Sequence, residues 1–443
     1  MRLPRYEAYK DSGTAMGPVP SAWAVMRLMQ VASVNDDVLS ETTDAETEIE
    51  YVDIGSVSLD RGIERTERIN FGKAPSRARR QVQDGDVLVS TVRTYLKAIA
   101  PVVAPPANLV VSTGFAVVRP TFGLLSGYAK YVLQSSGFVD EVISRSTGVS
   151  YPAINASELV RICVPVPPTR EQAAIAGFLD RETAKIDALI AEQEKLIILL
   201  AEKRQATISH AVIRGLDPNA RMKDSGVVWL GEVPAHWRVM RVKDVARLES
   251  GHTPSKQHPE YWENCDIPWV SLNDSKFLAA NDYIAETAVM INELGLANSS
   301  ARMLPPGAVV FTRDATIGLA AITERPMAVS QHLIAWCPSE KLTSLFLLRV
   351  FNAMRAHLDA HTFGATIKTI GMADVKKLVT PVPPPEEQKA ITQFIDAELA
   401  KMDVITADTK RALSLLKERR ATLIAAAVTG QIDVRGTIQD TGA

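Results

Sequence analysis

Two long stretches of the chain carry apolar residues at steps of three and four. This period is that of an amphipathic helix, with one apolar stripe turned toward a partner. The positions are Ile175, Leu179, Ile186, Leu189, Leu196 and Leu200 in the first stretch and Ile391, Ile395, Leu399, Met402 and Ile405 in the second. The first helix is predicted from Arg170 to Ile213, a length of about 65 Å. Gly215 and Gly430 are the expected stops.

Each helix follows a proline-rich connector, VPVPP from Val164 and TPVPPP from Thr380. Proline disfavours a helix in the residue before it, so both runs should be extended and should mark boundaries. Thr169 and Gln172 have the spacing of a capping box at the first helix start. The second helix has Pro385 there instead, followed by two glutamates that suit the positive end of the helix dipole.

The stretches before the helices carry short apolar runs with the pattern of strands, and each has one helical segment. The predicted strands are 51–57, 86–92, 108–118, 267–272 and 308–312, and the predicted helices are 127–136 and 344–358. The fold class indicated is therefore α+β.

The chain repeats itself at offsets of 213 to 216 residues. KDSG from Lys10 returns from Lys223, VPSAWAVMR from Val19 returns as VPAHWRVMR from Val233, and the connector with its helix returns from Thr380. The regions 35–140 and 250–355 match poorly, although GDVLVSTVR (85–93) resembles GAVVFTR (307–313). A shared scaffold therefore carries two divergent inserts.

The apolar seam of each long helix is too narrow to stabilise a lone helix in water, and the chain supplies one other helix of the same design. We expect the two to pack as an antiparallel coiled coil that relates the halves by a pseudo-two-fold axis. Two independent surface helices are the alternative. The domains expected are 1–163 and 217–379, with long helices in 164–216 and 380–435 and a disordered tail at 436–443.

Composition and charge change this picture only locally. The chain has 443 residues, 46% of them hydrophobic, and a net charge of −2, as in an ordinary globular protein. Residues 35–60 hold acidic side chains and no Lys or Arg, whereas 61–100 are rich in Arg and Lys. A basic face can therefore exist on a neutral protein. Three scattered cysteines and the lack of a membrane-spanning run favour a cytoplasmic location.

The two helices, each introduced by a PVPP-x-x-EQ run, and the VPxxW run before each variable domain resemble the specificity subunit of type I restriction–modification systems. The resemblance implies that each variable domain is a target recognition domain reading one half of a bipartite double-stranded DNA target. It also implies that the helices set the spacing and dock two modification subunits, which restriction and motor subunits join. S-adenosylmethionine, ATP and Mg are implied for those partners, and no cofactor for this chain.

Candidate DNA contacts are basic and small polar residues in loops, since Arg donates to guanine edges and phosphates and Thr or Ser to phosphates. They are Arg77, Arg79, Arg80, Arg93, Lys97, Thr147 and Ser150 in the first domain and Thr253, Lys256, Arg313, Thr316, Thr366 and Lys368 in the second. A solvated basic face is the alternative for each of them. Tyr95, Tyr261 and Trp262 are interpreted as packing residues.

The sequence carries no phosphate-loop, dinucleotide-binding or adenine-methylation motif, and no nuclease set of carboxylates and lysine. His210 and His332 lack a recognisable partner and are interpreted as structural. We therefore expect a non-catalytic protein. A protein-binding scaffold and a fragment of a DNA-modifying enzyme remain the alternatives.

Overall fold

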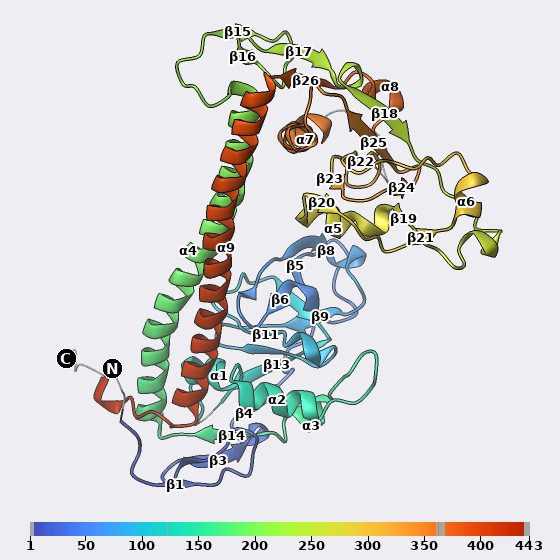
Figure 1. Cartoon of the computed structure of the whole chain (residues 1–443). Coiled ribbons are helices and arrows are strands. Elements are labelled where there is room, and N and C mark those ends of the chain that lie inside the picture. The colour runs from blue at the N-terminus through green and yellow to red at the C-terminus, as the bar shows by residue number, and fades with distance from the viewer. Residues whose placement is uncertain (1–3, 122, 360–361, 363–367, 438–443) are drawn as a thin grey trace. The chain divides into compact units, whose positions relative to one another are not determined.

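The structure is a computed structural model that describes residues 4–121, 123–359, 362 and 368–437 (Figure 1). The chain divides into two compact units, and each is described by itself. Unit 1 consists of Met1–Glu194 and Lys410–Ala443, and unit 2 of Lys195–Thr409. Both long helices, α4 (Thr169–Arg214) and α9 (Pro385–Val428), contribute residues to both units.

Unit 1 contains two four-stranded sheets of order β11-β10-β13-β4 and β8-β5-β12-β9, with β5 and β12 parallel. The strands of the first are β4 (Ala32–Val34), β10 (Val87–Ser90), β11 (Ile99–Pro101) and β13 (Phe115–Pro120). Those of the second are β5 (Glu48–Val52), β8 (Glu67–Asn70), β9 (Ala78–Gln81) and β12 (Leu109–Ser112). The helices are α1 (Ser126–Val132), α2 (Ser136–Ser144) and α3 (Ala156–Leu159).

The first sheet of unit 1 is buried on both faces. Leu88 and Phe115 point to a core shared with the second sheet, whereas Val87 and Val89 belong to a core with α1, α2 and the start of α4. Successive residues of a strand point to opposite faces, so a strand covered on both sides becomes a continuous apolar run. This is why residues 86–92 lack alternation.

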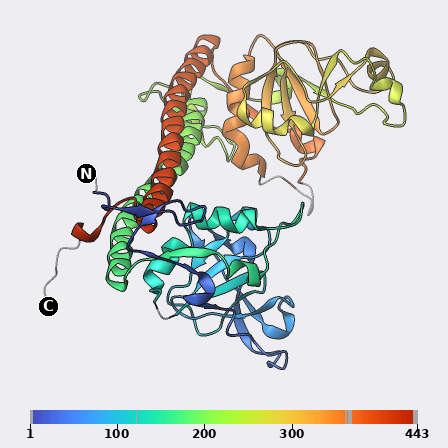
Figure 2. The same cartoon turned by 90° about the horizontal axis from the view of Figure 1, so that it is seen from below.

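Unit 2 is built in the same way, with sheets of order β18-β25-β22-β23-β20 and β21-β19-β24. The first contains β18 (Ala246–Ser250), β20 (Tyr283–Ile284), β22 (Val309–Thr312), β23 (Ala320–Thr323) and β25 (Leu333–Pro338). The second contains β19 (Ile267–Val270), β21 (Met290–Ile291) and β24 (Ala328–Val329). The helices are α5 (Ser275–Ala280), α6 (Glu293–Ala297), α7 (Ser344–Asp359) and α8 (Met372–Val375), and α7 lies against the larger sheet (Figure 2).

Short antiparallel pairs complete each unit. In unit 1 they are β1 (Tyr9–Lys10) with β2 (Val19–Pro20), β3 (Ala24–Arg27) with β14 (Cys163–Val166), and β6 (Val57–Ser58) with β7 (Gly62–Ile63). In unit 2 they are β15 (Met222–Asp224) with β16 (Glu232–Pro234), and β17 (Arg238–Arg241) with β26 (Val379–Val382). Strands β14 and β26 are the proline-rich connectors, which are extended as predicted.

Most predicted elements are confirmed, and three change at turns. The first long helix runs one residue beyond the predicted range at each end. Residues 108–118 form two strands in different sheets, because the chain turns at Thr113 and Gly114. The strand predicted at 51–57 ends at Val52, where a 3-10 turn begins. The helix predicted at 127–136 stops at Val132 and restarts as α2, since the Ser135 hydroxyl bonds the Val132 carbonyl.

A buried tryptophan joins the start of one long helix to the end of the other in unit 1. The Trp23 indole donates a hydrogen bond from Nε1 to Glu171 Oε2 at 2.7 Å. Gly430, just after α9, has a φ of +68°, and a Cβ there would clash with the Pro20 ring and lie 3.1 Å from the Trp23 ring. This residue must be glycine both for its backbone conformation and for the close approach of these two rings.

Unit 2 repeats this junction with its own residues. Trp237 Nε1 donates to Glu387 Oε2 at 2.8 Å. Gly215, just after α4, has a φ of +72°, and a Cβ on it would lie 3.0 Å from the Trp237 ring. In each unit the start of one long helix therefore lies beside the end of the other. The paired segments run in opposite directions, with Asp187 bonded to Arg420 in unit 1 and Arg204 bonded to Asp403 in unit 2.

The glutamine after each junction glutamate connects the helix to the domain before it. Gln172 Oε1 accepts from the Leu125 amide at 2.8 Å, and its Nε2 donates to the carbonyls of Gly123 and Pro167 at 2.7 and 2.8 Å. Gln388 makes the same three bonds with Thr343, Lys341 and Pro383. This role differs from the capping box predicted for Gln172, because the amide is occupied by three backbone groups.

Candidate nucleic-acid interface

The predicted contact residues of unit 1 lie on three segments that hydrogen bonds join into one edge. The turn at Thr113 and Gly114 is the centre: the Thr113 amide donates to the Arg77 carbonyl at 2.7 Å, and the Gly114 carbonyl accepts from the Thr91 amide at 2.8 Å. The SRARR segment and the segment that begins at Thr91 therefore lie on either side of one turn.

The third segment is the loop between α2 and α3. The Thr91 carbonyl accepts from the Ile154 amide at 2.9 Å, and the hydroxyl of buried Thr94 bonds to Ser146 Oγ at 2.8 Å. This loop carries Thr147 and Ser150, both exposed. The structure thus brings together segments that lie up to about 70 positions apart in sequence, as the pairing of β10, β12 and β13 requires.

Arg93 and Lys97 flank a 3-10 turn, and both adopt the left-handed conformation with φ of 52°. That conformation costs a non-glycine residue roughly 1 kcal/mol and is concentrated at functional segments. Both side chains are exposed. The Arg93 guanidinium lies 5.1 Å from the centre of the Tyr151 ring, so the cation is held on the α2–α3 loop.

The three arginines of SRARR differ in their surroundings. Arg77 is exposed. Arg79 lies over the Phe71 ring at 4.7 Å and reaches the Ser76 carbonyl. Arg80 is partly buried, and its Nε has no hydrogen-bond partner among the described residues. Burial lowers the pKa of the Arg80 guanidinium, which is the expected result when a charge leaves water without a counter-ion.

Unit 2 has a corresponding edge at the ends of β22 and β24. The Arg313 amide donates to the His332 carbonyl at 3.0 Å, and the Arg313 carbonyl accepts from the Ile370 amide at 2.9 Å. The Ala315 amide donates to the Lys368 carbonyl at 2.9 Å. Arg313 and Lys368 therefore come together, and Thr316 lies exposed in the same turn.

A chain of side-chain contacts crosses this edge. The Thr253 hydroxyl bonds to Gln331 Oε1, and Gln331 Nε2 lies 3.3 Å from His332 Nε2. The other ring nitrogen of His332 is 2.7 Å from Asp314 Oδ2. The network presents an amide and an imidazole at the surface, which are groups that hydrogen-bond base edges. Lys256 lies exposed in the loop that carries Thr253.

Sequence reasoning missed this network. His332 was interpreted as structural, yet it connects Asp314 to the exposed Gln331. The position of the network in the sequence could have indicated it. Gln331 and His332 immediately precede β25, just as Thr113 and Gly114 immediately precede β13. Thr366 lies outside the described residues. Arg313 Nε and Asp314 Oδ1 are buried without a hydrogen-bond partner in the described part of the chain, and lie 3.9 Å apart.

The two edges share a backbone, but their arginines are not equivalent. Ile154 and Ile370 match in the repeat, and they donate to the carbonyls of Thr91 and Arg313, respectively. Arg313 therefore corresponds to Thr91. The runs GDVLVSTVR and GAVVFTR are therefore equivalent only in their glycine and the strand that follows it. Their arginines do not match, because the first run has two more residues before its arginine.

The backbone conformation supports this register. Arg93 of unit 1 corresponds to Ala315 of unit 2, and both have a left-handed φ, 52° and 64°. By the same register Gly114 corresponds to His332. The Gly114 carbonyl accepts a hydrogen bond from the amide of Thr91, just after β10, and the His332 carbonyl accepts one from the amide of Arg313, just after β22. Equivalent positions on one scaffold thus carry different chemistry in the two units.

The aromatic residues have mixed outcomes. Trp262 packs edge-on against Trp269 at 5.5 Å and Tyr261 stacks on His258 at 5.0 Å, which confirms their interpretation as packing residues. Tyr95 is 53% exposed and Tyr151 is 65% exposed, so Tyr95 is not a core residue. Tyr151 was not identified from the sequence, although its position beside STGVS could have indicated it.

A search of the described residues finds no group of three or more His, Cys, Asp or Glu side chains that could hold a metal ion. Within the same residues, no helix is both long enough and apolar enough to cross a membrane.

The comparisons with known proteins agree on one family. Residues 234–413 match the family model described as the type I restriction modification DNA specificity domain. The MjaIX type I specificity subunit of Methanocaldococcus jannaschii is 31% identical over 170 residues, which cover 38% of each chain. The putative MjaX specificity subunit of the same organism is 21% identical, with 96% of this chain and 98% of that chain covered.

Solved structures share the fold. One chain, from a study of complex assembly and conformational transition of the type I R-M system, matches with a TM-score of 0.67 and 23% identity, covering 94% of this chain and 99% of its own. The HsdS subunit of Thermoanaerobacter tengcongensis matches with a TM-score of 0.50 and 22% identity, over 94% and 98%. Residues 234–413 thus resemble a type I restriction modification DNA specificity domain. The chain as a whole is similar to type I specificity subunits and shares the fold of the solved structures.

Proposed function

We propose that this chain is the sequence-specific DNA-binding subunit of a type I restriction–modification complex, and that each unit reads one half of a bipartite double-stranded target. The observation that carries the proposal is the pair of edges with one backbone and different side chains. Gly114 in one unit and His332 in the other occupy the same place. Two such edges are suited to two different half-sites.

The side chains at the edges divide into two kinds by their chemistry. The exposed cations, such as Arg77, Lys97 and Lys256, suit phosphates, which position a protein on the duplex. The amide of Gln331 and the ring of His332 suit base edges, because hydrogen bonds in the major groove distinguish base pairs. We assign sequence reading in unit 2 to this second kind.

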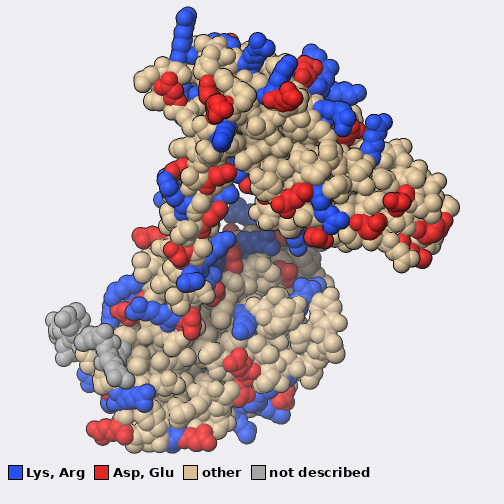
Figure 3. Space-filling model, in the orientation of Figure 1, with Lys and Arg blue, Asp and Glu red and all other residues tan. Residues whose placement is uncertain are grey.

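The long helices would serve as the spacer between the half-sites. We propose that α4 and α9 form an antiparallel coiled coil along their length, with the two units related by a pseudo-two-fold axis. The helices would dock two modification subunits, to which restriction and motor subunits bind. In this proposal the chain is non-catalytic and cytoplasmic, and S-adenosylmethionine, ATP and Mg are used by the partners. The acidic and basic side chains interspersed along the helices (Figure 3) favour a solvent-exposed spacer.

Methylation mapping tests this function directly. Cells that carry the modification subunits are sequenced for methylated bases with and without the gene for this chain. The expected result is a bipartite methylated motif that disappears without the gene. Methylation of the same motif without this chain would refute the proposal, and methyl transfer by the purified chain alone would revive the enzyme alternative.

An exchange of residues 35–155 for those of a relative is expected to change one half of the motif and leave the other half unchanged. The exchanged range includes β5 to β13, α1, α2 and the α2–α3 loop, whereas it excludes Trp23, β4, Gln172 and the long helices α4 and α9. Methylation mapping of the hybrid measures both halves at once. A protein-binding scaffold would leave both halves unchanged, and that result would contradict the assignment of reading to unit 1.

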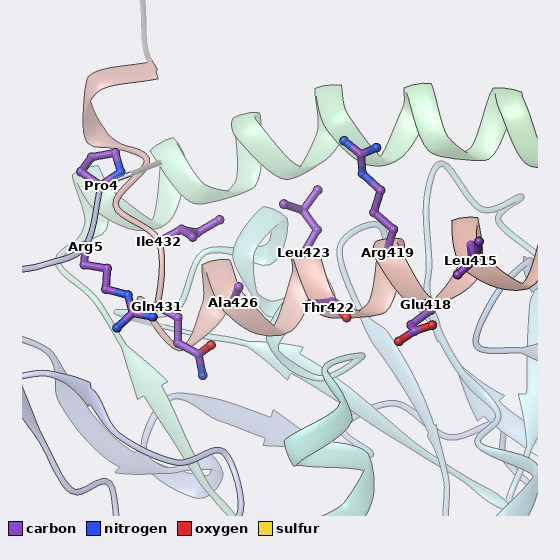
Figure 4. A pocket seen from close by; sticks show the side chains of 10 residues that line it. All are labelled: Pro4, Arg5, Leu415, Glu418, Arg419, Thr422, Leu423, Ala426, Gln431 and Ile432. Carbon is purple, nitrogen blue, oxygen red and sulfur yellow. The ribbon is translucent and has the colours of Figure 1, made fainter. Parts of the chain in front are cut away.

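We further assign docking of one modification subunit to a groove of about 1090 Å³ on unit 1 (Figure 4). It is lined by the last turns of α9, the segment after them and the N-terminal segment. Leu415, Leu423 and Ile432 supply apolar surface, with Arg5 and Arg419 also in the lining. Leu415 is 58% exposed, and together with Leu423 and Ile432 it gives the groove an apolar lining beside charges, as in the core and rim of a protein contact.

Replacement of Leu415 by aspartate is expected to weaken docking at this groove by about tenfold or more, since a charge would enter an apolar contact. The complex should then carry one modification subunit instead of two, as measured by native mass spectrometry. Leu294→Asp, at a leucine of similar exposure on α6, is the matched control. Two modification subunits bound to the Leu415 variant would show that docking lies elsewhere.

A further inference from the structure

The loop between α2 and α3 ends in a finger, residues 147–153, that exposes large apolar side chains. Its base is closed by two hydrogen bonds between Thr147 and Ala153, each amide donating to the other carbonyl at 2.9 Å. Gly148 turns the chain with a φ of +107°. Val149 is fully exposed and Tyr151 is 65% exposed. The finger is thus a short, closed loop whose apolar groups face solvent.

The neighbouring turn adds to the same surface. Tyr95 and Leu96 are about half exposed, and this turn is tied to the finger through the Thr94 amide, which donates to the Pro152 carbonyl at 3.4 Å. Scattered exposed apolar residues need no explanation. Four of them on two hydrogen-bonded loops form a patch, and such patches mark binding surfaces.

Cations flank this patch, but its centre is uncharged. Residues 146–157 contain no Asp, Glu, Lys or Arg, and the part of unit 1 that carries the α2–α3 loop is largely free of charge in Figure 3. Arg93 lies over the Tyr151 ring, and Lys97 is at the other end of the turn. Neither cation has an ion-pair partner among the residues that the structure describes, so both are available to anions.

The shape of the patch distinguishes between possible occupants. In Figure 1 the α2–α3 loop projects from the helices it connects. A protein–protein interface of standard size covers a broad surface of about 800 Å² on each side. A narrow apolar tip between two cations instead suits a base step between two phosphates. Proteins that deform DNA insert such apolar side chains between bases and unstack them.

We propose that the 147–153 finger is a DNA wedge, in which Val149 and Tyr151 enter a base step at the half-site read by unit 1 while Arg93 and Lys97 hold the adjacent phosphates. This proposal rests on the proposed function. It adds a contribution to specificity that requires no base-edge contact, because the energy of unstacking depends on the step. Flexible pyrimidine–purine steps are the preferred sites.

The test uses the chain assembled with its modification subunits and a duplex that carries the motif from methylation mapping. 2-Aminopurine is placed in turn at each step of the half-site, except at the methylated base, which methyltransferases themselves extrude. A several-fold rise in fluorescence is expected at one step. Replacement of both Val149 and Tyr151 by serine should abolish it and weaken target binding about tenfold, with binding to unrelated DNA changed by less than about twofold.

The control replaces an equally exposed valine and an exposed tyrosine of unit 2, Val228 and Tyr283, by serine and should leave the signal unchanged. No fluorescence rise at any step of a duplex that the complex still methylates would overturn the wedge alone. Loss of modification subunits from the finger variant, seen by size-exclusion chromatography, would show that the finger binds protein and would also overturn it. A complex without any sequence preference would overturn both proposals.

Discussion

Replacement of Trp237 by alanine is expected to lower the free energy of unfolding of unit 2 by about 4 kcal/mol, as for other buried tryptophans. The side chain is completely buried. Its Nε1 is bonded to Glu387 at the start of α9, and its ring contacts the end of α4 at Gly215. The substitution therefore removes a core side chain and a hydrogen bond at the point where both long helices meet the unit.

Chemical denaturation of the purified chain, monitored by circular dichroism, measures this effect. Trp23→Ala should destabilise unit 1 to a similar extent, because Trp23 makes the same contacts with Glu171 and Gly430. Trp262→Ala, at a partly exposed tryptophan, should cost about half as much or less. A loss below about 1 kcal/mol at Trp237 would show that the junction does not stabilise the unit.

The same junction explains the most conspicuous motif of the sequence. The sequence predicts helix capping for Gln172 and an interaction with the helix dipole for Glu386 and Glu387. In the structure the glutamate accepts a hydrogen bond from the tryptophan indole. The glutamine pairs with three backbone groups, two in the preceding domain and one in the connector. An unpaired buried polar group costs about 1–3 kcal/mol, so a residue that pairs three of them is hard to replace. Two of its three partners, Leu125 and Gly123, lie about 50 positions away, and no local pattern could reveal them.

The elements were predictable where local chemistry determines them. The long helices are marked by period and glycine stops, and the connectors by proline. Turns inside an apolar run were not predictable, as residues 108–118 show. Both strands in this range are buried, so the sequence looks like one continuous apolar run although the chain passes from one sheet to another at Gly114. Apolar continuity reports burial on both faces and does not report connectivity.

The loops that carry the candidate interface were predictable from the sequence, whereas their positions next to one another were not. STGVS, SRARR and the segment at Arg93 come together only because β10 and β12–β13 are neighbours. The network of Gln331, His332 and Asp314 depends on the same strand pairing in unit 2. The two arginines aligned by eye, at 93 and 313, prove to be two positions out of register.

A buried arginine with two partly exposed carboxylate partners shows how the domains are held to the helices at matching places. Arg349 on α7 is almost fully buried and bonds to Asp282 and Asp396, each at 2.6 Å from Nη2. Burial lowers the pKa of Arg349, but the two carboxylates outweigh this and raise it. In unit 1 the equivalent of Asp396 is Asp180, which accepts from the Tyr131 hydroxyl at 2.7 Å. The helix thus offers the same carboxylate to different partners, which lets the domain diverge while its anchor stays.

Because each domain is anchored to its own part of the long helices, lengthening both helices should change the distance between the half-sites. Insertion of seven residues after Glu194 in α4 and seven after Thr409 in α9 places both blocks at the boundary between the units, so the contacts within each unit are kept. A heptad returns the apolar stripe to within about 20° of its original direction. Each helix is lengthened by about 10 Å, the length of about three base pairs of DNA. The spacer of the methylated motif is therefore expected to grow by about three base pairs, with both half-sites unchanged.

Methylation mapping of cells with the lengthened chain measures this shift. Three base pairs also rotate the second half-site about the DNA axis by roughly a third of a turn, so the new motif should be methylated more slowly than the original. A matched control carries the block in one helix only; it breaks the register of the pair and should abolish methylation at both spacings. If the lengthened chain still directed methylation to the original motif, the helices could not set the distance, and unit spacing would have to come from the modification subunits.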